Sequence, residues 1–99
     1  MYVIREVVRC RPGKVGQMID KFKLIGSAMR EMGHEPFRLL TDVTGEPFWT
    51  LVAETQVAAI DEFFVLERRL MASPTLREVM NGYHDLVSNG RREIFKVEG

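Results

Sequence analysis

The side chains of this sequence that could transfer a proton are a carboxylate and an imidazole among apolar neighbours. Glu6 stands in the middle of an apolar alternating face, and His84 lies beside Tyr83 at the edge of an apolar helical stripe. Such a group could remove a proton from a phenolic or keto-enol substrate, because burial shifts its pKa. Trp49, Tyr83 and Phe95 could bind the substrate ring, and the tyrosine could donate a hydrogen bond. For Glu6, His84 and Trp49 the sequence favours a structural interpretation: a paired acid, a hydrogen-bonded histidine, and an aromatic residue of a core or subunit interface.

Other kinds of chemistry find little support. The two histidines, His34 and His84, belong to no His-x-x-x-His or Cys-x-x-Cys spacing, so we expect no metal site. The sequence has no glycine-rich phosphate loop and no nucleophile elbow, and we therefore predict no cofactor. Cys10 is the one cysteine, which allows no disulfide within the chain and fits a reducing compartment.

Composition limits the class of protein. Ninety-nine residues, 45% of them hydrophobic, predict a single domain over residues 1–99. Fourteen basic and fourteen acidic residues cancel, which argues against a nucleic-acid or anionic membrane partner. No apolar run reaches the roughly 18 residues that a membrane span requires, and no secretory signal opens the chain. We therefore expect a cytoplasmic protein.

Strands and helices that alternate along the chain must position the candidate residues. The first half predicts a strand over 2–10, a helix over 15–32 that ends at Gly33, and strands over 35–44 and 48–55 joined by the turn Gly45-Glu46-Pro47. The second half predicts a helix over 57–71 capped by Thr55, and a helical piece that restarts at Ser73-Pro74. Gly82 marks a bend or close packing in this piece, Asn89-Gly90 end it, and the last strand covers 91–98.

The order of these elements is βαββαβ, which predicts the ferredoxin-like α+β fold. Its right-handed crossovers place all helices on one face of a four-stranded antiparallel sheet. The strand over 48–55 alternates Trp49, Leu51 and Ala53 with Phe48, Thr50 and Val52, so both of its faces are interpreted as mostly apolar. One helical layer can cover only one face, and we therefore predict that a second copy of the chain covers the other.

One binding module with this topology, the RNA-recognition domain, is disfavoured by the same strand. That domain carries glycines and a leading basic residue in a run of aromatics on its third strand. Here the strand reads Pro47-Phe48-Trp49-Thr50-Leu51-Val52-Ala53-Glu54, without those glycines or that basic residue. We expect no nucleic-acid partner.

Several segments resemble a known family. The run Arg11-Pro12-Gly13-Lys14 after the first strand, the central hairpin, the Ser73-Pro74 restart and the ending from Leu86 to Val97 are similar to dimeric α+β-barrel proteins, in particular NIPSNAP-type domains. The resemblance covers nearly the whole chain. It implies a homodimer whose two sheets meet face to face with the helices outside.

The wider superfamily implied by this resemblance includes cofactor-free monooxygenases, haem-degrading enzymes, muconolactone isomerases and ligand-sensing domains. Haem-degrading members use a set of Asn, Trp and His, and this chain offers Trp49 and His84 but no asparagine in its first strand. That difference argues against haem degradation. The resemblance does not choose among the other activities.

Two functional hypotheses therefore stand, and whether the protein is an enzyme stays open. The first is a dimer that binds a small apolar or aromatic ligand in a cavity between sheet and helices. The second is a cofactor-free monooxygenase or isomerase in which His84 or Glu6 removes a proton while Trp49 and Tyr83 bind the ring.

Overall fold

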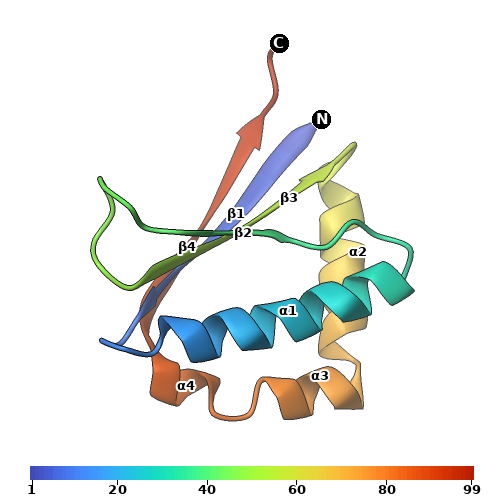
Figure 1. Cartoon of the computed structure of the whole chain (residues 1–99). Helices are drawn as coiled ribbons and strands as arrows, with labels where there is room; N and C mark the ends of the chain where they lie inside the picture. Colours follow the sequence, from blue (N-terminus) through green and yellow to red (C-terminus); the bar gives the residue numbers. More distant parts are fainter.

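The computed structural model describes the whole chain, residues 1–99, as a four-stranded antiparallel sheet with helices on one side (Figure 1). The elements in chain order are β1 (Tyr2–Cys10), α1 (Val15–Glu31), β2 (Arg38–Thr41), β3 (Thr50–Val57), α2 (Ile60–Met71), α3 (Pro74–Val79), α4 (Tyr83–Leu86) and β4 (Val87–Lys96). The strands lie in the order β2-β3-β1-β4. This arrangement confirms the predicted ferredoxin-like α+β fold. No helix is long and apolar enough to cross a membrane.

The strand register assigns each side chain to one of the two faces of the sheet. Residues directly opposite each other in antiparallel strands share a face. Glu6 pairs with Ala53 of β3 and with Arg92 of β4, so these three side chains belong to the face that the helices cover. Arg5 pairs with Glu54, and both belong to the opposite face, which we call the open face.

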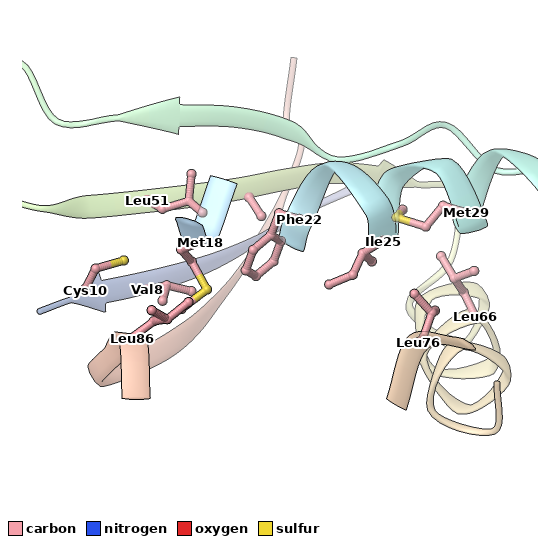
Figure 2. Packing of buried hydrophobic residues seen from close by; sticks show 11 residues of the cluster. Val8, Cys10, Met18, Phe22, Ile25, Met29, Leu51, Leu66, Leu76 and Leu86 are labelled. Atoms are coloured by element: carbon pink, nitrogen blue, oxygen red, sulfur yellow. The ribbon is translucent and has the colours of Figure 1, made fainter. Parts of the chain in front are cut away.

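The hydrophobic core fills the space between the sheet and the helices. Its main cluster has 11 buried residues: Val8, Cys10, Met18, Phe22, Ile25, Met29, Leu51, Ala53, Leu66, Leu76 and Leu86. Four of them recur at three- and four-residue steps along α1, which turns one side of that helix toward the sheet (Figure 2). The interpretation of the α1 methionines as core residues is confirmed at Met18 and Met29, which are fully buried.

The loop between β2 and β3 is longer than predicted, and β3 begins only at Thr50. Phe48 and Trp49 lie in a turn, where Trp49 has a positive φ of 66°, so neither residue contributes to a face of the strand. The turn is held locally, because Thr50 Oγ1 donates to the carbonyl of Pro47 at 2.7 Å and Thr50 N donates to Asp42 Oδ1 at 2.9 Å. The predicted strand over 48–55 was wrong at its start for this reason.

Four further predicted features needed correction or confirmation. Thr55 is not a helix cap, since it pairs with Ile4 inside the sheet and α2 begins after Ala59. Asn89 and Gly90 lie within β4 rather than at a helix end, and a Cβ at Gly90 would come within 3.2 Å of the Val7 carbonyl oxygen. The Ser73-Pro74 restart is confirmed, because Ser73 Oγ accepts a bond from Leu76 N. A bend at Gly82 is also confirmed, since its φ is +86°.

The open face is not the mostly apolar surface that the sequence suggested. Glu54 accepts hydrogen bonds from Arg5 Nε at 2.8 Å and from Arg38 at 2.5 Å, and Arg5 lies over the Phe95 ring at 5.4 Å. Beneath such side chains Val7 is only 2% exposed, since long arginine stems can cover apolar surface. The expectation was wrong because it was based on one strand, while the arginines come from β1, β2 and β4.

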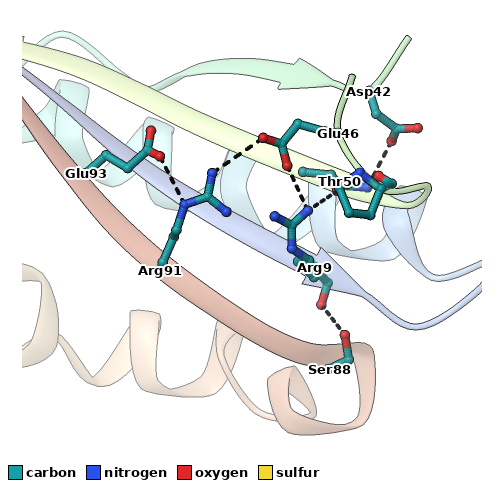
Figure 3. A network of polar contacts seen from close by, with 8 residues as sticks. Arg9, Asp42, Glu46, Thr50, Ser88, Arg91 and Glu93 are labelled. Atoms are coloured by element: carbon teal, nitrogen blue, oxygen red, sulfur yellow. Dashed lines mark hydrogen bonds and ion pairs between the residues drawn. The ribbon is translucent and has the colours of Figure 1, made fainter. Parts of the chain in front are cut away.

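A second ionic network on the open face ties the β2–β3 loop to the sheet (Figure 3). Glu46 in this loop accepts from Arg9 at 2.8 Å and from Arg91 at 3.4 Å. Arg9 also donates to Thr50 Oγ1 at 3.1 Å, and Arg91 Nε donates to Glu93 at 2.9 Å. These contacts leave Phe48 and Trp49 at the exposed end of the loop.

Candidate functional site

The sheet and the helices form a cavity of about 530 Å³ that is partly open to solvent. Ten of its 14 lining residues are hydrophobic, and they come from every layer of the fold: the apolar walls include Val8, Phe22, Ile25, Phe37, Leu76 and Met80. A volume of this size, apolar with a few polar groups, is typical of sites for small organic molecules. The cavity lies on the side of the sheet that the helices cover.

One polar cluster interrupts the apolar lining. Arg92 Nε donates to Glu6 Oε1 at 2.5 Å, while its two terminal nitrogens bind the carboxylate of Glu67. The guanidinium also lies 4.9 Å from the centre of the Phe63 ring. The fold dictates this meeting, because Arg92 is the register partner of Glu6 and Glu67 stands one helical turn after Phe63 on α2.

Burial changes the acid–base properties of this cluster. Desolvation raises the pKa of the Glu6 carboxyl above its ordinary value near 4.5, although the hydrogen bond and the charge of Arg92 oppose the rise. Burial also raises the pKa of Tyr83, and the negative charge of Glu6 adds to that effect. Glu6 Oε2 and the Tyr83 hydroxyl make no hydrogen bond within the protein, while Glu6 uses Oε1 for Arg92. Both groups are therefore able to bind a ligand in the cavity.

The wall that carries Tyr83 is fastened to α1 by a lysine. Lys21 Nζ donates to the carbonyl of Val79, the last residue of α3, at 2.6 Å and to the Asn81 carbonyl just after it at 2.8 Å. A cation satisfies the free carbonyls of a helix end well. Gly82 then turns the chain with its positive φ, and α4 begins at Tyr83. Lys21 thus helps to position the segment that closes one side of the cavity.

The structure brings together two of the five residues that the sequence singled out. Glu6 and Tyr83 both line the cavity. His84 packs edge-to-face on Tyr83, with ring centroids 5.5 Å apart, but is exposed and does not line the cavity. Trp49 is 40% exposed in the β2–β3 loop, and Phe95 is 50% exposed on the open face. The five side chains therefore do not converge on one void.

Sequence reasoning missed Arg92 and Glu67, which carry most of the charge at the site. The signal for Arg92 was its place in the last strand, opposite Glu6 once β1 and β4 are paired. The predicted last strand included Arg92 but gave no register against β1. For Glu67 the signal was its i, i+4 spacing from Phe63, which places both side chains on one side of α2.

No protein-family model and no curated protein matches this sequence. Solved structures do match. A NIPSNAP domain protein from Burkholderia xenovorans superposes with a TM-score of 0.82 at 15% identity, over 100% of this chain and 96% of that one. The chain has the fold of NIPSNAP family proteins. Another of them, of unknown function and from Agrobacterium tumefaciens, gives a TM-score of 0.81 at 17% identity, over 98% of this chain and 87% of that one.

Solved structures named as monooxygenases share the fold. A proposed antibiotic biosynthesis monooxygenase from Nitrosomonas europaea superposes with a TM-score of 0.75 at 12% identity over 100% of both chains. The resemblance inferred from the sequence is therefore confirmed at the level of fold. Identities this low extend no activity to the present chain. No group of three or more His, Cys, Asp or Glu side chains is placed to hold a metal ion.

Proposed function

We propose that the protein binds a small apolar or aromatic molecule with one polar group in the cavity between sheet and helices. The observation that carries the proposal is an apolar cavity of about 530 Å³ with Glu6 and Tyr83 free to hydrogen-bond within it. The apolar walls would supply affinity by removing ligand surface from water, and the polar groups would orient the ligand.

A neutral fluorescent probe such as N-phenylnaphthylamine tests this proposal. We expect its emission to rise on addition of the protein, and its binding to raise the melting temperature. Met80→Trp should fill part of the cavity and weaken binding, whereas Leu24→Trp, on the exposed side of α1, should not. A wild-type protein that gives neither signal with the probe or a broad metabolite panel would refute the proposal.

The second candidate function is a cofactor-free monooxygenase or isomerase acting on a phenolic or keto-enol substrate. One observation favours it: the Glu6 carboxylate has a raised pKa and a free oxygen in the cavity that Tyr83 shares. In this proposal Glu6 removes the substrate proton and Tyr83 hydrogen-bonds the substrate oxygen. The monooxygenase-like fold neighbours agree with it.

Turnover measurements decide between binding and catalysis. On a substrate found by screening, Glu6→Gln should reduce kcat by about a hundredfold or more, the usual contribution of a positioned base. His84→Ala should have little effect if Glu6 is the base and a large effect if the imidazole removes the proton instead. Full turnover in both variants would show that neither residue is the base.

We also propose that two copies of the chain associate through the open face, in a protein of the cytoplasm. Partly exposed Leu40 and Phe95 between the ion pairs support this, since interfaces commonly combine apolar and polar area. Light scattering should give twice the mass of the chain. Phe95→Glu should shift the mass toward one chain, and Val65→Glu on the exposed side of α2 should not. A single-chain mass for the folded wild type at all concentrations would refute the dimer.

A further inference from the structure

The charges at the polar end of the cavity indicate which ligands it accepts, an inference that rests on the binding function proposed above. We infer that Glu67 makes the cavity select ligands whose polar group donates a hydrogen bond, such as a hydroxyl or an ammonium, and reject ligands that end in a carboxylate. Glu67 would then determine specificity without itself binding the ligand's donor group, which would hydrogen-bond to Glu6 Oε2.

The hydrogen-bonding directions of Arg92 carry the first part of the argument. A free guanidinium would offer a two-pronged site for a carboxylate ligand. Here its Nε donates to Glu6, Nη1 donates to Glu67 Oε1, and Nη2 donates to Glu67 Oε2. The planar edge that a carboxylate ligand would use is therefore already occupied by a carboxylate of the protein.

The balance of charge carries the second part. Two carboxylates share one guanidinium, so the cluster of Glu6, Glu67 and Arg92 has a formal charge of about −1. Arg77 is the other charged residue of the cavity wall, but it is exposed and its Nε donates to the Met71 carbonyl at 3.4 Å. Solvent screens a charge in that position. A ligand carboxylate would meet net repulsion at the cluster.

The third part of the argument depends on the carboxylate oxygen of Glu6 that Arg92 does not bind. Glu6 Oε2 accepts no bond from the protein, and Glu6 lines the same cavity as Tyr83, whose hydroxyl is also without a protein partner. An ionised carboxylate can only accept hydrogen bonds, so it needs a donor from the ligand. In the free protein this oxygen still reaches solvent. A bound ligand would exclude that water, and an acceptor that loses water without gaining a donor is costly, which penalises ligands that have no donor.

The experiment compares naphthol with naphthoate substituted at the same ring carbon, at neutral pH, by displacement of N-phenylnaphthylamine. The two ligands share the apolar ring and differ in whether the polar group donates or carries charge. We expect the wild type to bind naphthol several-fold more tightly, the effect of one repulsion that solvent screens in part, because the side chains of Glu6, Glu67 and Arg92 are 22%, 32% and 34% exposed. Naphthylmethylammonium should bind at least as well as naphthol.

Variants at Glu67 test the assignment. Glu67→Ala removes the carboxylate from both terminal nitrogens of Arg92, and Glu67→Gln keeps the shape while removing the charge. Each should raise naphthoate affinity relative to naphthol several-fold. Glu62→Gln, an exposed residue of the same helix outside the cavity, is the matched control and should leave the ratio unchanged. Circular dichroism and melting verify that each variant is folded.

The possible outcomes separate this inference from the proposed function. Probe binding with naphthoate equal to or tighter than naphthol in the wild type would overturn the inference and leave ligand binding standing. A wild-type preference for naphthol that persists in both Glu67 variants would overturn the role of Glu67. No probe binding at all would overturn the proposed function and the inference together.

Discussion

Each face of the sheet carries a cluster of three ion-paired side chains, but the ratio of acidic to basic groups is reversed between the two faces. On the side that the helices cover, one guanidinium, that of Arg92, is shared by Glu6 and Glu67. On the open face, one carboxylate, that of Glu54, is shared by Arg5 and Arg38. The pKa directions follow: burial raises the pKa of Glu6, whereas the hydrogen bond from Arg5, aided by Arg38, lowers the pKa of Glu54 despite some desolvation.

This difference separates a surface that stabilises charge from one that leaves a charged acceptor partly unsatisfied. Glu46 repeats the open-face pattern, since Arg9 and Arg91 both bind it and its pKa is also lowered, first by the hydrogen bond from Arg9. Glu6 has only a shared partner and an apolar environment. A ligand that donates a hydrogen bond to Glu6 could therefore stabilise the covered face.

The largest expected difference between the faces is in packing. Leu51→Ala, at a fully buried position on the covered side of β3, should cost about 3 kcal/mol in the free energy of unfolding, because it leaves a void in the core. Val52→Ala, the next residue and on the open face, should cost about 1 kcal/mol. Urea denaturation with a common m-value measures both.

Repeating this measurement at several protein concentrations separates the cost of lost packing from the cost of lost association. If two chains associate through the open face, the cost of Val52→Ala should grow with concentration, because it then includes lost association. A cost for Val52→Ala equal to that for Leu51→Ala at high dilution would contradict the contrast between the faces.

The next largest effect on stability is expected in the helices, which cover only one face of the sheet. Lys21→Met keeps the aliphatic stem but removes the bonds to the carbonyls of Val79 and Asn81, and should cost about 1 to 2 kcal/mol. Amide hydrogen exchange of residues 74–86 should rise more than that of the sheet. Lys23→Met, an exposed lysine of the same helix, serves as control. Unchanged exchange in the Lys21 variant would show that the wall holds without it.

A smaller effect is expected at Glu54. Its folded pKa is lowered, so its contribution to stability is complete above the ordinary value near 4.5 and is lost as pH falls through the folded pKa. Glu54→Gln should therefore be less stable than the wild type at neutral pH, by less than about 1 kcal/mol, and the deficit should shrink in acid. Thermal melts across this pH range measure it, and a deficit that grows in acid would be inconsistent with the ion pairs described.

The opposite sign is expected at Glu6. Its folded pKa is raised, so the native state takes up a proton more readily than the unfolded chain between about 4.5 and the folded pKa. The wild type should gain stability relative to Glu6→Gln as pH falls through this window. This slope is the smallest of the four effects, because Arg92 opposes the shift. A slope of the same sign as that of Glu54→Gln would remove the contrast between the two carboxylates.

The sequence predicted the order of elements well, because helical periodicity in α1 and strand alternation in β1 are local signals. It failed at Phe48 and Trp49, where β-prone side chains lie in a turn fixed by Thr50 and Asp42. It failed similarly at Asn89-Gly90, since a turn-like dipeptide is overridden when pairing with β1 brings residue 90 close to the Val7 carbonyl, where a Cβ would lie 3.2 Å from the oxygen. Local propensity cannot report such tertiary demands.

The candidate site was only partly predictable for the same reason. Glu6 was found because its polarity contrasts with its own strand, and Tyr83 because it lies on an apolar helical stripe. Arg92 and Glu67 become functional only through the register of β4 against β1 and the packing of α2, which no single segment encodes. His84 is adjacent to Tyr83 in sequence, but α4 turns its side chain toward solvent.

The position of Trp49 has a spectroscopic consequence. It is the one tryptophan of the chain, it lies at the loop that Glu46 ties to the open face, and it does not line the cavity. Its intrinsic emission should thus report the meeting of two chains, and a ligand that does not absorb light in the range of indole emission should leave it unchanged. One unlabelled sample could then follow assembly through indole fluorescence with the cavity empty or filled by such a ligand.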